Sequence, residues 1–201
     1  MPTYHNMPQR TDEWFEIKLG KIGGSEFSKL FMKPTTQGYK DLVLSKAIEI
    51  VTGVAVDDGF AGSYWTRRGT DLEPLAVKEY EKRTFNKVHA VGFVEMNEFV
   101  GCSPDGLIGE NGGFEGKCLK YSNHVEMIKN PHIPKDYLWQ CIGFLFVTKR
   151  DWIDFNCFHP GLKSVTIRLT KEECAADFAA LQEALVKTIA AINNEVKFLR
   201  S

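Results

Sequence analysis

Hydrophobic residues in the first part of the chain recur every three or four positions, a spacing that is typical of helices with one buried face. Thr11 and Ser25 can cap the first two of these helices, and Gly53 can end the third. The four predicted helices span residues 11–19, 25–31, 39–51 and 66–83. In the fourth, Leu72, Leu75, Ala76 and Tyr80 are expected to face the core.

From Lys87 onward the hydrophobic positions alternate, which predicts strands near 88–94, 99–102, 113–119, 152–158 and 164–169. A helix over 134–147 interrupts them, with Cys141 and Phe144 on its apolar side and Gln140 close by. The last helix begins at a capping box, Thr170 to Glu173, and runs to Val196. Together these elements predict an α/β (α+β) fold with helices flanking a central sheet.

Composition limits the number of domains and the class of protein, but it indicates no function. With 201 residues, 43% of them hydrophobic, the chain is expected to form one domain over 1–201. It has no apolar run long enough to cross a membrane and no secretory pattern at its N-terminus, so we expect a cytosolic protein. Its five cysteines form no C-x-x-C pair and are expected to be reduced packing residues.

The formal net charge of −1 argues against a broadly basic surface, so any contact with nucleic acid must be local. Basic pairs offer candidate phosphate contacts, although such pairs are more often solvated surface. These pairs are Lys29 with Lys33, Arg67 with Arg68, and Lys149 with Arg150.

Two carboxylates and an amine carry the candidate chemistry. Asp105 is expected to end one strand and Glu115 to lie in the next, and the glycine-rich turn over 109–113 allows a hairpin that brings them together. Lys117 follows two residues after Glu115 and therefore shares its strand face. Carboxylates with the Gly116 carbonyl can hold Mg²⁺, as phosphodiester cleavage requires, but an acid followed by E-x-K also occurs by chance.

Further motifs help to decide whether this E-x-K triplet is catalytic or occurs by chance. The chain carries Gln9-Arg10-Thr11 ahead of Trp14, the segment Lys18 to Ser25, Arg68-Gly69 with Glu73, Ser103-Pro104-Asp105-Gly106, Glu115-Gly116-Lys117, and Tyr137 with Gln140. In this order and spacing they resemble the lambda-exonuclease type of phage recombination nuclease, the YqaJ-like viral recombinase family of the PD-(D/E)xK superfamily. The resemblance spans nearly the whole chain and implies a restriction-endonuclease-like core with a mixed sheet. Lysine at position 18 replaces the family's arginine.

The resemblance also implies roles. Asp105, Glu115 and the Gly116 carbonyl would bind one Mg²⁺, Asp105 with Glu73 a second, and Mn²⁺ would substitute; Lys117 would be the catalytic lysine and Gln140 would lie beside it. Without the resemblance, Glu73 and Gln140 are ordinary polar residues of helices. Residues expected to bind the terminal 5′-phosphate or the DNA are Trp14, Lys18, Ser25, Ser103, Trp65, Arg67 and Arg68. Ser25 can instead be only a helix cap, and Trp65 can be a core residue rather than a wedge against an unpaired base.

The implied function is a Mg²⁺-dependent, processive 5′→3′ exonuclease on double-stranded DNA that releases 5′-mononucleotides and leaves a 3′ single-stranded tail. The resemblance also implies a homotrimeric ring and a single-strand annealing recombinase as partner. It further implies a bacterial host cytoplasm as the location and a phage or prophage origin. Two alternatives stay open: a structure-specific or restriction-type endonuclease on the same core, and a non-catalytic protein that binds DNA ends.

Overall fold

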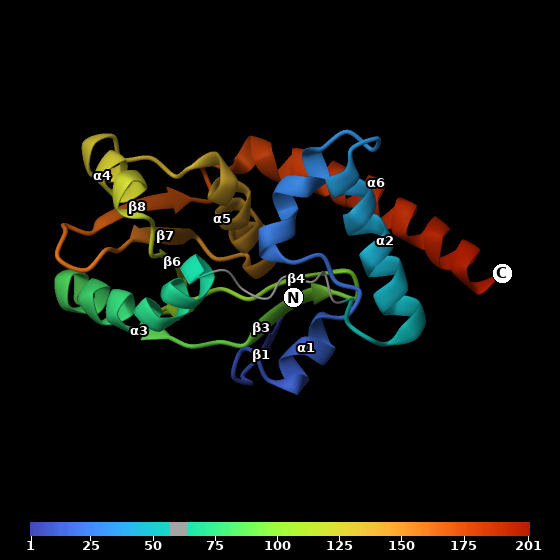
Figure 1. Cartoon of the computed structure of the whole chain (residues 1–201), viewed down its shortest axis with the longest axis horizontal. Coiled ribbons are helices and arrows are strands. Elements are labelled where there is room, and N and C mark those ends of the chain that lie inside the picture. Colours follow the sequence, from blue (N-terminus) through green and yellow to red (C-terminus); the bar gives the residue numbers. More distant parts are fainter. Residues whose placement is uncertain (57–63) are drawn as a thin grey trace.

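The computed structural model describes residues 1–56 and 64–201, without the side chains of residues 64–67 and 70. Its helices are α1 (Asp12–Lys18), the 3₁₀ helix η1 (Gly24–Phe31), α2 (Gln37–Thr52), α3 (Tyr64–Thr84), α4 (Tyr121–Lys129), α5 (Lys135–Thr148) and α6 (Ala175–Arg200). Its strands are β1 (Thr3–His5), β2 (Val88–His89), β3 (Phe93–Asn97), β4 (Val100–Cys102), β5 (Gly106–Ile108), β6 (Gly112–Lys117), β7 (Trp152–Cys157) and β8 (Val165–Thr170) (Figure 1).

The strands form two sheets. The larger has the order β2-β5-β6-β7-β8, and all of its neighbours are antiparallel except β6 and β7, which run parallel. The smaller has the antiparallel order β1-β3-β4. Helices α4 and α5 lie in the crossover between β6 and β7, because parallel neighbours need a long connection. The predicted α/β fold with a mixed sheet and flanking helices is confirmed.

The main core lies where η1, α2, α5 and α6 pack together and against the sheets (Figure 1). Phe27, Ile142 and Leu181 are among its fully buried side chains. Gly143 permits the close approach of η1 to α5, since a Cβ atom there would lie 2.0 Å from Cδ2 of Phe27. All five cysteines are free, and four are buried, as expected of packing residues.

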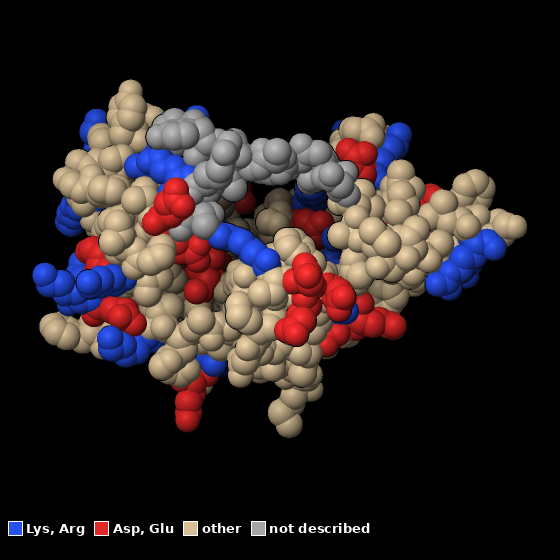
Figure 2. All heavy atoms as spheres, turned by 60° about the horizontal axis from the view of Figure 1, so that its bottom comes forward, with Lys and Arg blue, Asp and Glu red and all other residues tan. Residues whose placement is uncertain are grey.

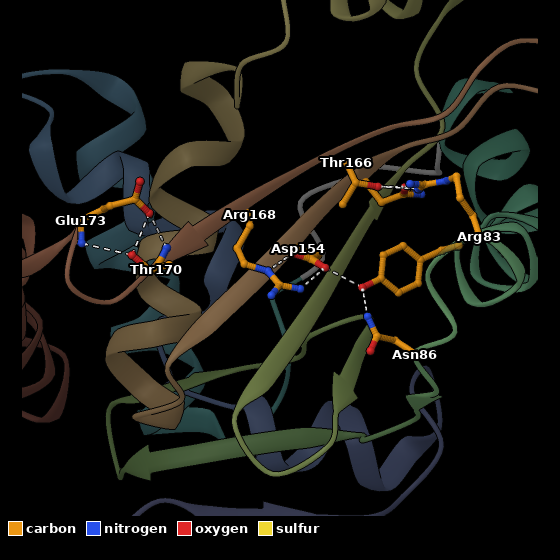
Figure 3. A network of polar contacts seen from close by, with 9 residues as sticks. Arg83, Asn86, Asp154, Thr166, Arg168, Thr170 and Glu173 are labelled. Atoms are coloured by element: carbon orange, nitrogen blue, oxygen red, sulfur yellow. Dashed lines mark hydrogen bonds and ion pairs between the residues drawn. The ribbon is translucent and has the colours of Figure 1, made fainter.

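A polar network fixes the second half of α3 against the larger sheet (Figure 3). The buried carboxylate of Asp154 on β7 accepts a hydrogen bond of 2.6 Å from the Tyr80 hydroxyl and two, of 2.7 and 2.9 Å, from the Arg168 guanidinium. Arg83 donates to Asn156 and Thr166 on β7 and β8. Glu73 is seven residues before Tyr80 and therefore lies on nearly the same side of the helix, two turns away. The network thus sets the direction from which Glu73 approaches the sheet.

Several local expectations were wrong. Ser25 lies inside η1, whose N-cap is Gly23, because the Glu26 side chain accepts from the Gly23 N–H and starts the helix earlier. Leu75 is 52% exposed, since Ala76 and Tyr80 occupy the buried face. The box of Thr170 and Glu173 does form, but it closes a turn ahead of α6. Helix α4 and strands β1 and β5 were not expected; each is short, and the strands span only three residues.

Candidate active site

The β5–β6 hairpin brings the two motif carboxylates to neighbouring positions. Gly106 pairs with Phe114 across the antiparallel hairpin. Asp105 comes directly before Gly106 and Glu115 directly after Phe114, so the two acids lie opposite each other. The expectation that Asp105 ends a strand was wrong. Asp105 lies at a bend directly before β5, because the chain passes there from β4 in the smaller sheet to β5 in the larger one. Its Oδ2 accepts a 2.8 Å hydrogen bond from the N–H of Gly116, which holds the carboxylate beside β6.

Glu115 is the most enclosed group of the site, with 2% of the residue exposed. Its Oε1 contacts the ammonium group of Lys117 and accepts a 2.6 Å hydrogen bond from the side-chain amide of Gln140 on α5. The Lys117 Nζ also lies 5.4 Å from the ring centre of Tyr137. The crossover helix and β6 therefore meet at one carboxylate oxygen.

Glu73 reaches the same place from α3. Its Oε2 lies 3.8 Å from the guanidinium of Arg10, a residue that sequence reasoning did not assign to the site. Burial and the charge of Asp105 raise the pKa of Glu73 above its ordinary value. Burial and Asp105 also raise the pKa of Glu115 to about 7. Burial alone would lower the pKa of Lys117, but Glu115 and Asp105 outweigh it and raise this pKa.

All of these residues except the buried Glu115 line a cavity of about 780 Å³, here named the central cavity. It is lined by Arg10, Ser25, Gly69, Glu73, Ala76, Asp105, Gly116, Lys117, Cys118, Leu119, Lys120, Asn123, Tyr137 and Gln140. Its volume is within the range of small-molecule sites. Figure 2 shows acidic and basic side chains interspersed around a hollow on the side of α1 and α3. No continuous basic surface is visible there, which agrees with the net charge.

The donor set suits a divalent cation. Asp105 and Glu115 offer hard oxygens. Burial first, and the charge of Asp105 second, raise the pKa values of Glu73 and Glu115, and a cation at the site would offset both effects. Among the described residues, no three carboxylate, thiol or imidazole groups are arranged to hold an ion together. In this arrangement Lys117 and Gln140 share the Glu115 oxygen, so an ion there would have to draw it away from them.

The expected 5′-phosphate residues are only partly brought together. Ser25 lines the central cavity, and the hydroxyl of Ser103 accepts a 2.9 Å hydrogen bond from the Trp14 indole N–H. Lys18 lies 3.5 Å from the centre of the Trp14 ring and lines a different cavity, of about 620 Å³, with Glu26 and Lys46. Burial lowers the pKa of Lys18 to about 8. Tryptophan thus separates the lysine from the serine.

Among the other basic and aromatic candidates, one arginine lies near the central cavity and another braces a turn. The side chains of Trp65 and Arg67 lie outside the described residues. Arg68 is half-buried, and its charge acts on the thiol of Cys118 at the central cavity. Arg150 donates to the carbonyls of Gly109 and Gly112 at 2.9 and 2.8 Å, which makes it a brace for the β5–β6 turn.

Sequence reasoning missed three polar residues that line the central cavity: Arg10, Lys120 and Asn123. Arg10 stood in a motif, between Gln9 and the helix cap Thr11, but the motif gave it no role. Lys120 and Asn123 reach the cavity through α4, which hydrophobic spacing did not predict.

Among the described residues no helix is long and apolar enough to cross a bilayer.

Known proteins share this fold. The model of the YqaJ-like viral recombinase domain matches residues 13–151. The crystal structure of an alkaline exonuclease from Laribacter hongkongensis is 26% identical with a TM-score of 0.85, and the match covers 94% of this chain and 96% of that one. The structure of that protein in complex with dAMP gives the same values. A phage related exonuclease from Haemophilus somnus is 17% identical with a TM-score of 0.59, covers 89% and 94% of the two chains, and shows the shared fold. No curated protein matched significantly.

Proposed function

The chain belongs to the YqaJ-like viral recombinase domain family, and from this premise we propose that it is an exonuclease that degrades double-stranded DNA in the 5′→3′ direction. The family and the similarity to the alkaline exonuclease make it a deoxyribonuclease. One observation carries the assignment of its chemistry. Glu73 on α3, Gln140 on α5, Lys117 on β6 and Asp105 before β5 line one cavity, and the buried Glu115 contacts Lys117 and Gln140 there.

In the proposed mechanism, Asp105, Glu115 and the Gly116 carbonyl would hold one Mg²⁺, and Asp105 with Glu73 would hold a second; Mn²⁺ would be able to replace either. When bound, the ions would supply charge neutralisation and activation of the nucleophile. Lys117 remains protonated next to Glu115, so its ammonium stabilises the negative charge that develops on the phosphate. Gln140 keeps the Glu115 carboxylate oriented.

The products proposed are 5′-mononucleotides and a 3′ single-stranded tail. The similar exonuclease from Laribacter hongkongensis has been solved with dAMP, a mononucleotide of the class expected here. Ser25 at the central cavity supports recognition of the terminal nucleotide. We propose that Ser103, Trp14 and Lys18 contribute to DNA binding through their linked contacts, although Lys18 lines a separate cavity. Lysine in place of the family's arginine retains a positive charge but loses the bidentate geometry for a phosphate.

Polarity is tested with a linear duplex labelled separately at each 5′ and each 3′ end. With Mg²⁺, we expect early release of the 5′ label as a mononucleotide and late release of the 3′ label; with chelator, we expect neither. Covalently closed circular duplex should resist the enzyme. Early release of the 3′ label would refute the polarity, and nicking of the circle at a similar rate would favour the endonuclease.

We further propose a homotrimeric ring that encloses the DNA. Its support is the net charge of −1, because a protein that encloses its substrate needs fewer phosphate contacts to stay bound than an open nuclease does. Sedimentation should give a trimer of the 22.8 kDa chain, and a challenge with excess unlabelled duplex should not stop digestion of an engaged molecule. A monomer that releases its substrate after each cut would contradict the ring.

The tail left by such an enzyme is the substrate of a single-strand annealing recombinase, which we propose as the partner. The family description as a viral recombinase domain supports this link to recombination and a phage or prophage origin. The cytoplasm of a bacterial host is the compartment where such DNA ends are met.

A further inference from the structure

A second cavity adjoins the central one. It has a volume of about 450 Å³ and is lined by residues 6–10 and 90–92, together with Glu73 and Asp105; we name it the loop cavity. Arg10, Glu73 and Asp105 line both cavities, so they stand at the junction between them. The carboxylates proposed to hold the ions therefore have a ligand-sized space on each side.

The loop that forms this cavity is fastened to the active site. The side-chain amide of Gln9 donates to the carbonyl of Val91 at 3.1 Å and to that of Pro104, the residue before Asp105, at 2.9 Å. At the other end Thr11 caps α1. Arg10, between these two anchors, has a φ of 69°, in the left-handed region that residues with a side chain adopt rarely and often at functional sites. The loop therefore holds Arg10 at the junction by its backbone.

The Arg10 side chain retains capacity for a ligand. Its guanidinium nitrogen lies 3.8 Å from Glu73 Oε2, too far for a hydrogen bond, and 57% of the side chain is exposed. A guanidinium has five N–H donors in a geometry that matches two oxygens of one phosphate. Arg10 lines the loop cavity together with Glu73 and Asp105, so its guanidinium is placed to bind an anion that approaches from that cavity.

We propose that the loop cavity binds the nucleotide on the 3′ side of the bond to be cut, and that Arg10 contacts the phosphate that follows that nucleotide. The inference rests on the proposed function and extends it. The terminal nucleotide occupies the central cavity, the scissile phosphate lies at Asp105 and Glu73, and the strand continues past Arg10. Arg10 is then a substrate-binding residue, and it fixes the register of the strand at the ions.

The test pairs a protein change with a substrate change. Release of the first nucleotide is measured in a single turnover, using a duplex with either a normal second linkage from the 5′ end or a neutral methylphosphonate there. For the parent protein we expect the modified duplex to react about 10-fold more slowly, as expected for one lost charged hydrogen bond. For Arg10→Ala we expect about a 10-fold loss with the normal duplex and no further loss with the modified one.

Arg10→Gln is measured in parallel, so that the result does not depend on one variant, and Lys187→Ala on the exposed face of α6 is the matched control that should equal the parent. Losses that multiply in Arg10→Ala would overturn the inference, because Arg10 would then act on the carboxylates and not on that phosphate. A parent protein that releases no nucleotide from any end would instead overturn the proposed function.

Discussion

Replacement of Lys117 by alanine is expected to slow phosphodiester hydrolysis about 1,000-fold, while binding to a duplex end stays within a few-fold of the parent. The ammonium group of Lys117 contacts Glu115, and Lys117 lines the central cavity. Removing it deprives the phosphate of a positive charge at the moment of cleavage. The measurement combines single-turnover release of a 5′ label with fluorescence anisotropy of a labelled duplex.

Lys117→Met serves as a second variant, because it keeps the length of the stem and loses only the charge. Lys187→Ala, at an exposed ion pair on α6, controls for the loss of any lysine. A melting temperature close to that of the parent shows that the fold is intact. Undiminished hydrolysis in both Lys117 variants would mean that the chemistry takes place elsewhere.

Asp105→Asn is expected to abolish both hydrolysis and the response of the protein to Mg²⁺. The amide oxygen of asparagine can still accept from the N–H of Gly116, so the local fold should persist while the negative charge is lost. At a Mg²⁺ concentration of about 100 times its dissociation constant, the parent should gain about 2.7 kcal/mol. For a chain of this size that corresponds to a rise in melting temperature of roughly 5–10 °C, and we expect the variant to lose most of it.

Thermal unfolding with Mg²⁺ and with chelator reads this effect without any nuclease assay. Glu98→Gln is the matched control, because Glu98 is an exposed acid in the turn between β3 and β4. Two results would contradict the metal site. One is a parent melting temperature that does not change with Mg²⁺, and the other is an Asp105→Asn protein whose melting temperature rises with Mg²⁺ as much as that of the parent.

The parts of the site that lie close together in the sequence were the parts that could be predicted. Glu115 and Lys117 share a strand face because side chains alternate along a strand, and a glycine-rich turn returns Asp105 to them. Glu73 and Gln140 needed the family resemblance, since only tertiary packing decides which helix faces the hairpin. For the same reason, hydrophobicity misassigned Leu75.

The positions of Arg10 and Lys18 could not be predicted from hydrophobic periodicity. Arg10 owes its position to a left-handed backbone and to two hydrogen bonds made by its neighbour Gln9. Lys18 belongs to a motif expected at the 5′-phosphate, yet its charge lies on the ring of Trp14 and its pKa is lowered by burial. Both depend on neighbours that bind distant parts of the chain: Gln9 donates to the backbone carbonyl of Val91, and Trp14 donates to the hydroxyl of Ser103.

The single parallel pair, β6 with β7, has a consequence for synthesis of the protein. Glu115 is made 37 residues before Trp152, the first residue of β7, and the connection that must close contains the helix with Gln140. Contacts between distant parts of a chain form late, because the loop between them must close first. Gln140 and β7 are therefore placed against the β5–β6 hairpin only after synthesis has passed β7, so we expect no nuclease activity from a chain that ends before it.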